Sequence, residues 1–356
     1  MPVSQKDIAK RTGISRALIS HALNGRPNVA SSTRQLILDT AREMGYRSDS
    51  TARRLAGRRN GVREPENTIC VIWPAMSEFP NDRSGQSLHD IPYFSDFLRG
   101  IESAADVFGV DLLCSSIRRS GRLPRVLLDA EVDGVLLLTL TPEIESQFAD
   151  VAIAKLVLGR ESKVIPGIVP DDEAGMRSIT EHVLSLGHRH VGYIGHPADH
   201  NAITQRRFSG YRKALRAAGI APNAAWEDTT LLHQDRDCAS KAAKTLLSRT
   251  PSITALICYN DIHAMGAIEG LQEIGVVVPR MVSVTGFDDA SVRYGFAPAI
   301  TSVAYDRQFM GRLAVQRIIA VRDSPAGDKT ASHPLLTIVA TSVVIRESTA
   351  RPPARP

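Results

Sequence analysis

Two patterns of apolar and polar positions divide the chain. Over residues 4–45, apolar side chains recur at the three- and four-residue spacing of short amphipathic helices. From Thr68 onward, short β-rich apolar runs alternate with longer helical stretches. This alternation is typical of parallel sheets with crossover helices. The sequence therefore predicts a small all-α head followed by a larger α/β body.

The body repeats its alternation, so we expect two doubly wound lobes. The first ends near residue 158, and the second begins after Asp171. The expected strands are 69–73, 110–114, 134–140, 153–158, 190–194, 253–259 and 282–287. The expected helices are 94–108, 142–151, 173–186, 207–218, 237–248 and 262–274. Ligands of such sheets bind in the crevice beyond the carboxyl ends of the strands.

The head contains the pattern of two crossing helices. Ser4 caps the first helix, and Gly13 ends it with a left-handed turn. Ser15 caps the second helix, and the residues expected to pack the pair together are Ile8, Ile19 and Ala22. This is the helix-turn-helix pattern over residues 5–24, although hairpins in ordinary helical bundles share it.

A third helix is expected between its N-cap Ser31 and Gly45. Its apolar face comprises Val29, Leu36, Ile37, Ala41 and Met44. The outward positions of the second helix are then Arg16, Ala17, Ser20 and His21. Arg16 has the geometry for two hydrogen bonds to a guanine in the major groove. A solvated surface charge is the alternative for this residue.

Charge is distributed unevenly between the two parts. Residues 1–64 carry 13 Lys+Arg against 5 Asp+Glu, and the remainder carries 30 against 33. A basic head on a slightly acidic body indicates a polyanionic partner for the head. Residues 50–59 are basic and too short for a stable isolated helix. We expect them to fold on DNA with Leu55 as a minor-groove wedge; a plain basic linker is the alternative.

Several classes of protein are excluded. Uninterrupted apolar runs such as 135–138 are too short to span a membrane, and no secretory signal is visible. The chain has no phosphate-binding loop, dinucleotide fingerprint or nucleophile elbow. We therefore predict no catalytic residue, no cofactor and no enzyme.

Cysteine and histidine positions argue against a metal site. The four cysteines are far apart and lack metal-ligand spacing: Cys70, Cys114, Cys238 and Cys258. Three of them lie in apolar, strand-like runs and are expected to be buried thiols, which favours the reducing cytoplasm. Four histidines span a helix end, a strand and a loop, so we expect unrelated surface or loop residues: His188, His190, His196 and His200.

Short motifs extend over nearly the whole chain. In the head they are Asp7-Ile8-Ala9-Lys10, Gly13-Ile14-Ser15, Ile19-Ser20, Leu23-Asn24-Gly25, Gly45-Tyr46-Arg47 and Ala52-Arg53-x-Leu55. In the body they are Leu98-Arg99-Gly100-Ile101, Val132-Asp133-Gly134, Asp171-Asp172-Glu173-Ala174-Gly175, Leu186-Gly187-His188-Arg189, Arg207-Phe208-Ser209-Gly210-Tyr211, Asn260-Asp261, Gly286-Phe287-Asp288-Asp289 and Arg346-Glu347-Ser348-Thr349. With these motifs the chain resembles the lactose/galactose repressor (LacI/GalR) family of bacterial transcription regulators.

The resemblance implies a small all-α helix-turn-helix DNA-binding domain and an α/β effector domain. The latter consists of two doubly wound parallel-sheet lobes and is periplasmic-binding-protein-like. The implied function is a ligand-responsive repressor that binds a pseudo-palindromic operator in double-stranded DNA as a homodimer. A sugar or sugar derivative would bind between the lobes, and the protein would act in the cytoplasm at the nucleoid. A solute receptor and a sugar-processing protein are the alternatives.

The expected domain boundaries follow the same resemblance. They are 1–48 for the DNA-binding domain, 49–64 for the hinge, 65–350 for the effector-binding and dimerisation domain, and 351–356 for a disordered tail. Crossovers between the lobes are expected near 165–170, 303–307 and 330–336. The stretch 77–91 resembles an insertion, either a lid or a surface loop. No heptad run argues for a tetramer.

The resemblance also implies a set of DNA contacts. They are Ser4, Gln5, Ser15, Arg16, Ala17, Ser20, His21, Asn24, Asn28, Thr33, Ala52, Arg53 and Leu55. Leu18 stands where the family usually has Thr and cannot contact a phosphate. His21 stands where it usually has Arg and offers one neutral donor instead of a charged fork. An operator sequence therefore does not carry over from relatives.

The implied effector contacts are Tyr93, Phe94, Arg160, Arg207, His233, Asn260, Asp288 and Tyr305. Asn260 and Asp288 follow predicted strands, and Arg207 begins a helix at the same end, so an Arg and an Asp can bind adjacent hydroxyls. Alternatives remain open at three of these positions. For Arg207 and Asp288 the alternative is a pair with each other across a closed cleft, and for Phe94 it is packing in the core. Asp261 is equally suited to cap its helix or to bind ligand.

One departure concerns the charge of the effector. Gly159 stands where the family often has a ligand-binding Asp, and Arg160 follows it. An acid lost beside a retained Arg favours a ligand with its own negative charge. The sequence thus suggests an acidic sugar derivative as one hypothesis for the effector.

Overall fold

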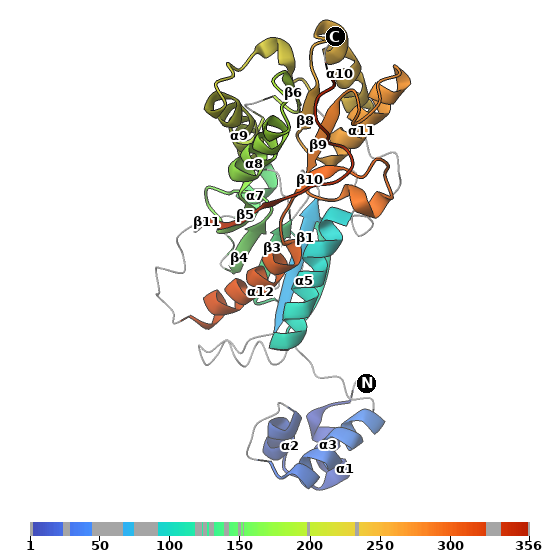
Figure 1. Cartoon of the computed structure of the whole chain (residues 1–356). Helices are drawn as coiled ribbons and strands as arrows, with labels where there is room; N and C mark the ends of the chain where they lie inside the picture. The colour runs from blue at the N-terminus through green and yellow to red at the C-terminus, as the bar shows by residue number, and fades with distance from the viewer. Residues whose placement is uncertain are drawn as a thin grey trace. The chain divides into compact units, whose positions relative to one another are not determined.

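The chain forms two compact units, residues 1–65 and 66–356. The computed structural model (Figure 1) describes residues 3–23, 29–44, 67–74, 92–117, 123, 127, 132–138, 142–148, 151, 153–197, 200–231, 235–324 and 336–354. The predicted hinge 49–64 and the predicted insertion 77–91 lie outside these residues. The first unit is the basic head, and the second is the α/β body.

The head consists of three short helices around one small core. They are α1 (Gln5–Thr12), α2 (Arg16–Leu23) and α3 (Ser31–Glu43). Ser4 and Asp7 cap α1, since the Ser4 amide and hydroxyl both donate to Asp7 Oδ2, at 2.9 and 2.6 Å. Gly13 ends this helix at φ +70°, as predicted. The buried residues are Ile8, Ile19, Ala22, Val29, Ile37 and Ala41.

Two details of the predicted third helix are wrong. Ser31 is the first residue of α3 rather than its N-cap, because the Arg34 amide donates to the carbonyl of Ala30. Leu36 was expected in the core but is 53% exposed, since Ile37 takes the inward position on that turn.

The N-terminal lobe is a six-stranded sheet in the order β11-β5-β4-β3-β1-β2. Its strands, all parallel to their neighbours, are β1 (Thr68–Pro74), β2 (Asp111–Ile117), β3 (Gly134–Leu138), β4 (Ala154–Leu158), β5 (Gly167–Pro170) and β11 (Leu336–Val339). Its helices are α5 (Pro92–Phe108), α7 (Pro142–Phe148) and α12 (Arg307–Asp323). The central strand β3 is buried along its whole length, as both faces of a doubly wound sheet require.

The C-terminal lobe has a second six-stranded sheet in the order β12-β10-β9-β8-β6-β7. Its strands are β6 (Val191–Ile194), β7 (Glu227–Asp228), β8 (Ala255–Cys258), β9 (Ser283–Phe287), β10 (Thr301–Ala304) and the antiparallel edge strand β12 (Ser342–Val344). Its helices are α8 (Asp172–Ser185), α9 (Ala202–Ala217), α10 (Arg236–Arg249), α11 (Asp261–Glu273) and the short 3₁₀ segments η3 (Ala224–Trp226) and η4 (Ser291–Tyr294).

The chain crosses between the lobes three times. The crossings run from β5 to α8, from β10 to α12 and from β11 to β12. The third lies between Val339 and Ser342 and not at the predicted 330–336, because the first lobe takes β11 as its edge strand before the chain leaves it.

Glycines allow three helix pairs to pack closely. A Cβ on Gly270 of α11 would lie 2.5 Å from the Ser240 carbonyl oxygen of α10, and one on Gly266 would lie 2.2 Å from that of Arg236. The same kind of contact joins α8 to α9 at Gly210. In Figure 1, α5 and α12 lie side by side in the first lobe, and there Gly311 has a similar role. These positions exclude any larger side chain unless the helices move apart.

Two of the histidines expected on the surface or in loops lie in loops and are buried. His188 is 1% exposed; its ring nitrogens contact Thr254 Oγ1 at 2.9 Å and the Ala350 carbonyl at 2.8 Å. His196 is 3% exposed, and its Nδ1 lies 2.6 Å from the Leu231 carbonyl. His188 holds the segment that leads into the C-terminal tail. The disorder expected from residue 351 is therefore wrong at Pro352, which packs against Gly187.

The burial of two of the strand cysteines agrees with the prediction, and that of the third does not. Cys70 on β1 and Cys258 on β8 are buried, as expected. Cys114 was expected to be buried but is exposed, because β2 is an edge strand of its sheet.

Among the described residues, none of the helices has the length and apolar character needed to cross a membrane.

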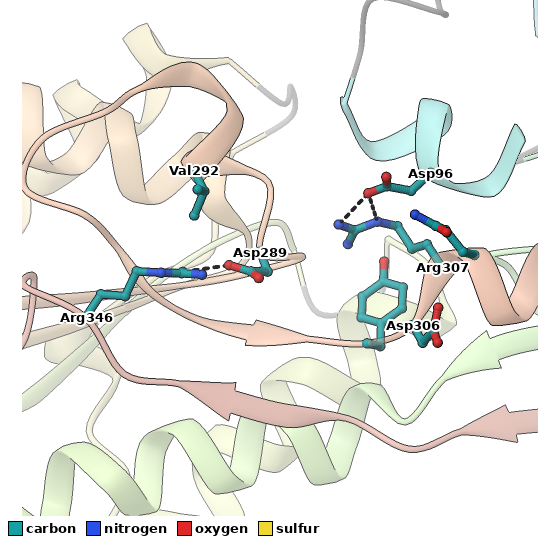
Figure 2. Close-up of a pocket in the computed structure, with 8 residues that line it drawn as sticks. Asp96, Asp289, Val292, Asp306, Arg307 and Arg346 are labelled. Carbon is teal, nitrogen blue, oxygen red and sulfur yellow. Dashed lines mark hydrogen bonds and ion pairs between the residues drawn. The ribbon is translucent and has the colours of Figure 1, made fainter. Parts of the chain in front are cut away.

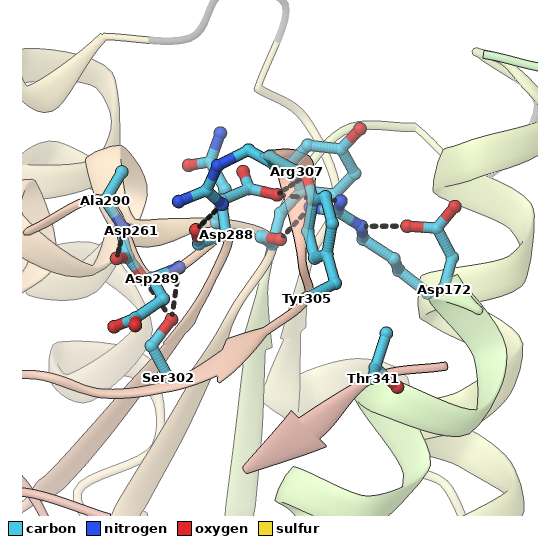
Figure 3. Close-up of polar contacts among 12 residues, drawn as sticks. Asp172, Asp261, Asp288, Asp289, Ala290, Ser302, Tyr305, Arg307 and Thr341 are labelled. Carbon is cyan, nitrogen blue, oxygen red and sulfur yellow. Dashed lines mark hydrogen bonds and ion pairs between the residues drawn. The ribbon is translucent and has the colours of Figure 1, made fainter. Parts of the chain in front are cut away.

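Asp261 anchors the loop that follows β9. Its Oδ2 accepts from the amides of Ala290 and Ser291, at 2.7 and 2.9 Å, and its Oδ1 accepts from Ser302 Oγ at 2.5 Å. Burial raises the pKa of this carboxyl to about 6, although these hydrogen bonds oppose the rise. Figure 3 shows Asp261 between the loop and β10.

We predict that Gly270→Ala destabilises the C-terminal lobe. Alanine favours an isolated helix by about 1 kcal/mol over glycine, but its methyl group would overlap the Ser240 carbonyl. Overpacking of this kind costs about 1–3 kcal/mol. Urea unfolding should show a net loss for Gly270→Ala and little change for Gln272→Ala, an exposed position of the same helix. Equal stability of the two variants would show that α10 and α11 separate freely.

We also predict that Asp261 makes stability fall as pH rises from about 4 to 6. In that range the unfolded chain has released this proton and the folded chain still holds it, so the free energy of unfolding drops by at most about 3 kcal/mol. Asp261→Asn cannot ionise and should lack this part of the drop. The measurement is urea unfolding between pH 4 and 7, with exposed Asp237→Asn as the control. Parallel curves for wild type and Asp261→Asn would contradict the prediction.

Candidate effector cleft and DNA-binding head

The described part of the head presents its predicted DNA contacts to solvent. Ser4, Ser15, Arg16 and Ala17 are exposed, and Gln5, Ser20, His21 and Thr33 are half-buried. The remaining predicted contacts lie outside the described residues: Asn24, Asn28, Ala52, Arg53 and Leu55. Leu18, the departure from the usual Thr, packs partly against the head core. The exposed start of α2 has the form that a recognition helix needs.

Arg207 is the centre of the polar network in the body. Its Nε donates to Asp172 Oδ1 at 2.8 Å, its Nη1 to the Tyr259 carbonyl at 2.8 Å, and its Nη2 to Asp288 Oδ1 at 3.2 Å. The guanidinium carbon lies 3.7 Å from the centre of the Phe287 ring. The partners come from the start of α8 and the ends of β8 and β9, so the network sits at the carboxyl edge of the second sheet.

The local structure around Arg207 differs from the prediction in two ways. The residue lies in the second turn of α9, because Asn201 caps that helix by accepting from the Thr204 amide at 2.9 Å. The pair with Asp288 forms within the second lobe and not across a cleft. Burial opposes the charge of Arg207, yet Asp288 and Asp172 hold its pKa well above the ordinary value. The guanidinium is therefore a fixed cation.

Asp172 is a site residue that the sequence reasoning missed. Its side chain is 1% exposed, and its Oδ2 has no hydrogen-bond partner in the described part of the chain. Burial raises the pKa of Asp172, and Arg207 opposes that rise. The signal was its place at the start of α8, two residues after β5, a four-residue strand that the periodicity did not show. Asp172 adds a second carboxylate to the guanidinium of Arg207.

Asp288 occupies a strained backbone position. Its φ is +95°, and that of Asp289 is +50°, a region that residues other than glycine rarely adopt. Asp288 Oδ1 accepts from Tyr305 Oη at 3.2 Å as well as from Arg207. Its amide donates to the Val303 carbonyl at 2.9 Å. The carboxylate is thus held at the strand end in a single orientation.

Asn260 and Asp261 have structural roles that the sequence did not separate. Asn260 Oδ1 accepts from the His263 amide at 2.9 Å, so Asn260 caps α11. The suggestion that Asp261 caps this helix is wrong, since its carboxylate is bound to the loop after β9. Asn260 is 3% exposed.

The other predicted effector contacts differ in how far their side chains are buried. Phe94 belongs to the apolar core of the first lobe, which agrees with the alternative interpretation. Tyr305 is buried beside Asp288, and Arg160 is half-buried after β4, where Gly159 has φ +77°. The side chain of Tyr93 and the whole of His233 lie outside the described residues.

Arg307 is a second arginine that the sequence reasoning did not identify. Its Nε and Nη2 donate to Asp96 Oδ2, at 3.2 and 3.1 Å, and its Nη1 donates to the Asp288 carbonyl. Both side chains of this ion pair are 8% exposed. Figure 2 shows them beside a hollow of about 350 Å³. Its lining also includes Asp289, Val292, Asp306 and Arg346.

Histidine rings gather near the end of β6 without forming a metal site. The His196 ring centre is 5.3 Å from that of His200 and 5.1 Å from that of His263. The described residues contain no group of three or more His, Cys, Asp or Glu side chains with the geometry to hold a metal ion. The described residues of the candidate site form a network of charged and polar side chains around Arg207.

Comparison with protein families matches both units. Residues 4–49 match the model for bacterial regulatory proteins of the lacI family, and residues 180–349 match the periplasmic binding protein-like domain. The two matches correspond to the head and to most of the second half of the body.

Individual relatives cover nearly the full length. The chain is 29% identical to the HTH-type transcriptional regulator CelR of Thermobifida fusca, over 96% of each protein. It is 26% identical to the HTH-type transcriptional repressor PurR of Aliivibrio salmonicida, over 88% of this chain and 90% of that one.

A solved structure of a CelR–cellobiose complex is 25% identical, with a TM-score of 0.67, over 97% of this chain and 99% of that one. The chain is therefore a ligand-responsive transcriptional regulator of the LacI family, with a LacI-type helix-turn-helix domain joined to a periplasmic binding protein-like domain, and it is not an enzyme.

Proposed function

We propose that the protein is a repressor that binds a pseudo-palindromic operator as a homodimer and responds to a sugar or sugar derivative. The observation that carries this proposal is the fixed Arg207–Asp288 pair at the carboxyl edge of the second sheet. The pair offers donors and acceptors side by side, which is what adjacent hydroxyls require. The exposed start of α2 supports the DNA-binding half.

Coupling between the two units would run through the hinge. The effector changes the angle between the two lobes. This change favours or opposes the folding of residues 50–59 on DNA with Leu55 in the minor groove. Coupling of this kind amounts to about 1–3 kcal/mol and is reciprocal. The protein would act in the cytoplasm, at the nucleoid that carries its operators.

The chemistry of the cleft supports a sugar-like effector. The similar CelR structure is a cellobiose complex. Asp172 and Asp288 already neutralise Arg207, so a negative group on the effector would need another cation. Arg160, half-buried after β4, is the residue we assign to that role. An acidic sugar derivative is the finer proposal.

The dimer would form at the β2 edge of the first lobe. β2 is the last strand of its sheet, and Leu113 on it is 38% exposed. Val107 and Phe108, at the end of the neighbouring α5, are 77% and 45% exposed. Burying this apolar patch against a second copy would stabilise a symmetric pair.

The experiment that tests the proposal is selection of genomic DNA fragments by the purified, ligand-free protein. Enrichment of one short pseudo-palindrome, with affinity that falls steeply as salt rises, is expected. Retention of no sequence over random fragments, with and without the sugars named below, would contradict it.

Arg16→Ala should relax base preference at one position in each half-site. The loss of a bidentate contact costs about 1–3 kcal/mol at the preferred base pair and little at the others. Competition binding with all substitutions of the selected operator measures this. Arg177→Ala, an exposed arginine of α8, is the control for lost charge. A uniform loss over all sequences would make Arg16 a phosphate contact.

Asp288→Asn should weaken effector binding at least tenfold and leave operator affinity unchanged, because it removes a charged acceptor from the cleft. Calorimetry with cellobiose, ribose, glucuronate, gluconate and glucose 6-phosphate gives the reference affinities. Exposed Asp237→Asn is the control. If Asp288→Asn bound the effector with wild-type affinity, Asp288 would not be an effector contact. Binding of neutral sugars without acidic ones would overturn the acidic effector.

A further inference from the structure

Arg307 joins the two lobes at the predicted effector site. It is the first residue of α12, directly after the second crossing, and only 7% exposed. One side of its guanidinium binds Asp96 on α5 of the N-terminal lobe. The other side binds the main-chain carbonyl of Asp288 in the C-terminal lobe. A single cation thus contacts both bodies that an effector would move.

The loop that Arg307 holds is a strained one. Asp288 and Asp289 both have positive φ, a backbone conformation that is unfavourable for residues other than glycine. A strained conformation persists only when the surroundings hold it from several sides. Here Asp261 holds the next two amides, Ser302 Oγ accepts from the Asp289 amide at 3.1 Å, and Arg346 lies 2.6 Å from the Asp289 carboxylate. Of the residues that hold this loop, Arg307 is the one that begins a helix of the N-terminal lobe, α12.

Asp96, the carboxylate partner of Arg307, lies at the predicted effector site. Asp96 is the fifth residue of α5, two residues after Phe94, in the segment that carries the predicted aromatic effector contacts. Its carboxylate accepts two hydrogen bonds from one guanidinium, and both side chains are almost fully buried. In a medium of low polarity, removing one partner leaves the other charge uncompensated. The two segments are therefore held together strongly.

We propose that Arg307 is a positioning residue that couples Asp288 to α5, so that occupancy of the C-terminal half of the cleft is transmitted to the N-terminal lobe. The proposal rests on the function proposed above for Asp288 but not on the identity of the effector. A shift of the Asp288 carbonyl changes the hydrogen bond to Arg307. Because the guanidinium is planar and rigid, the same shift alters its two bonds to Asp96.

Hydrogen exchange of the full-length, ligand-free protein tests the coupling. In Asp96→Asn, a change in the N-terminal lobe, the amides of Asp288, Ala290 and Ser291 in the other lobe should exchange about tenfold faster. Asp96→Glu, which restores the carboxylate, should return them toward the wild-type rate. Arg322→Met is the matched control, since Arg322 lies on α12 and pairs with Asp133 and Asp323 of the same lobe. It should leave the loop unchanged.

The double variant gives the decisive comparison. If Arg307 carries the coupling, Arg307→Met combined with Asp96→Asn should exchange at the loop as fast as either single variant. Wild-type exchange of the loop in Asp96→Asn, or additive effects in the double variant, would overturn the proposal. If Arg307→Met fails to fold, Asp96→Asn and its glutamate rescue decide alone. No effector is added, so a failed sugar panel and a failed coupling remain distinguishable.

Discussion

The buried guanidinium of Arg207 determines where the surrounding segments of the candidate site must lie. A charge removed from water is stable only when carboxylates and carbonyls surround it. Its partners are supplied by Asp172, Asp288 and Tyr259, which belong to three separate segments. Those segments must therefore end or begin at fixed points around one side chain. The protein's own residues thereby fix the arrangement of the carboxyl edge of the second sheet.

The sequence was informative wherever a repeating pattern or a local cap determined the structure. The head helices, the capping pair Ser4–Asp7 and the turn at Gly13 depend on residues close in the chain, and they were predictable. Both lobes were recognisable from the alternation of strands and helices. The terminal strands β11 and β12 were not, because strands of three or four residues show too few positions for a periodicity to appear.

The errors at the site have a common physical cause. Asn260 and Asp261 are adjacent polar residues after a strand, and either has a side chain suited to cap a helix. Which one does so depends on a loop some 30 residues further along the chain, whose amides donate hydrogen bonds to the Asp261 carboxylate. Asp172, Asp96 and Arg307 were missed for the same reason, since each owes its role to a residue remote in sequence. Long-range charge pairing leaves no local pattern.

The last described residues have a consequence for how the protein is made. Ser348 is fully buried; its hydroxyl donates to the Val284 carbonyl and accepts from the Thr301 amide, so it links β9 to β10. β11, synthesised shortly before it, is the edge strand of the other lobe. A ribosome that has completed α11 has therefore not yet supplied the residues that complete either sheet. The three head helices, by contrast, have their whole core within the first 44 residues. During synthesis the DNA-reading part is complete long before the part that senses the effector.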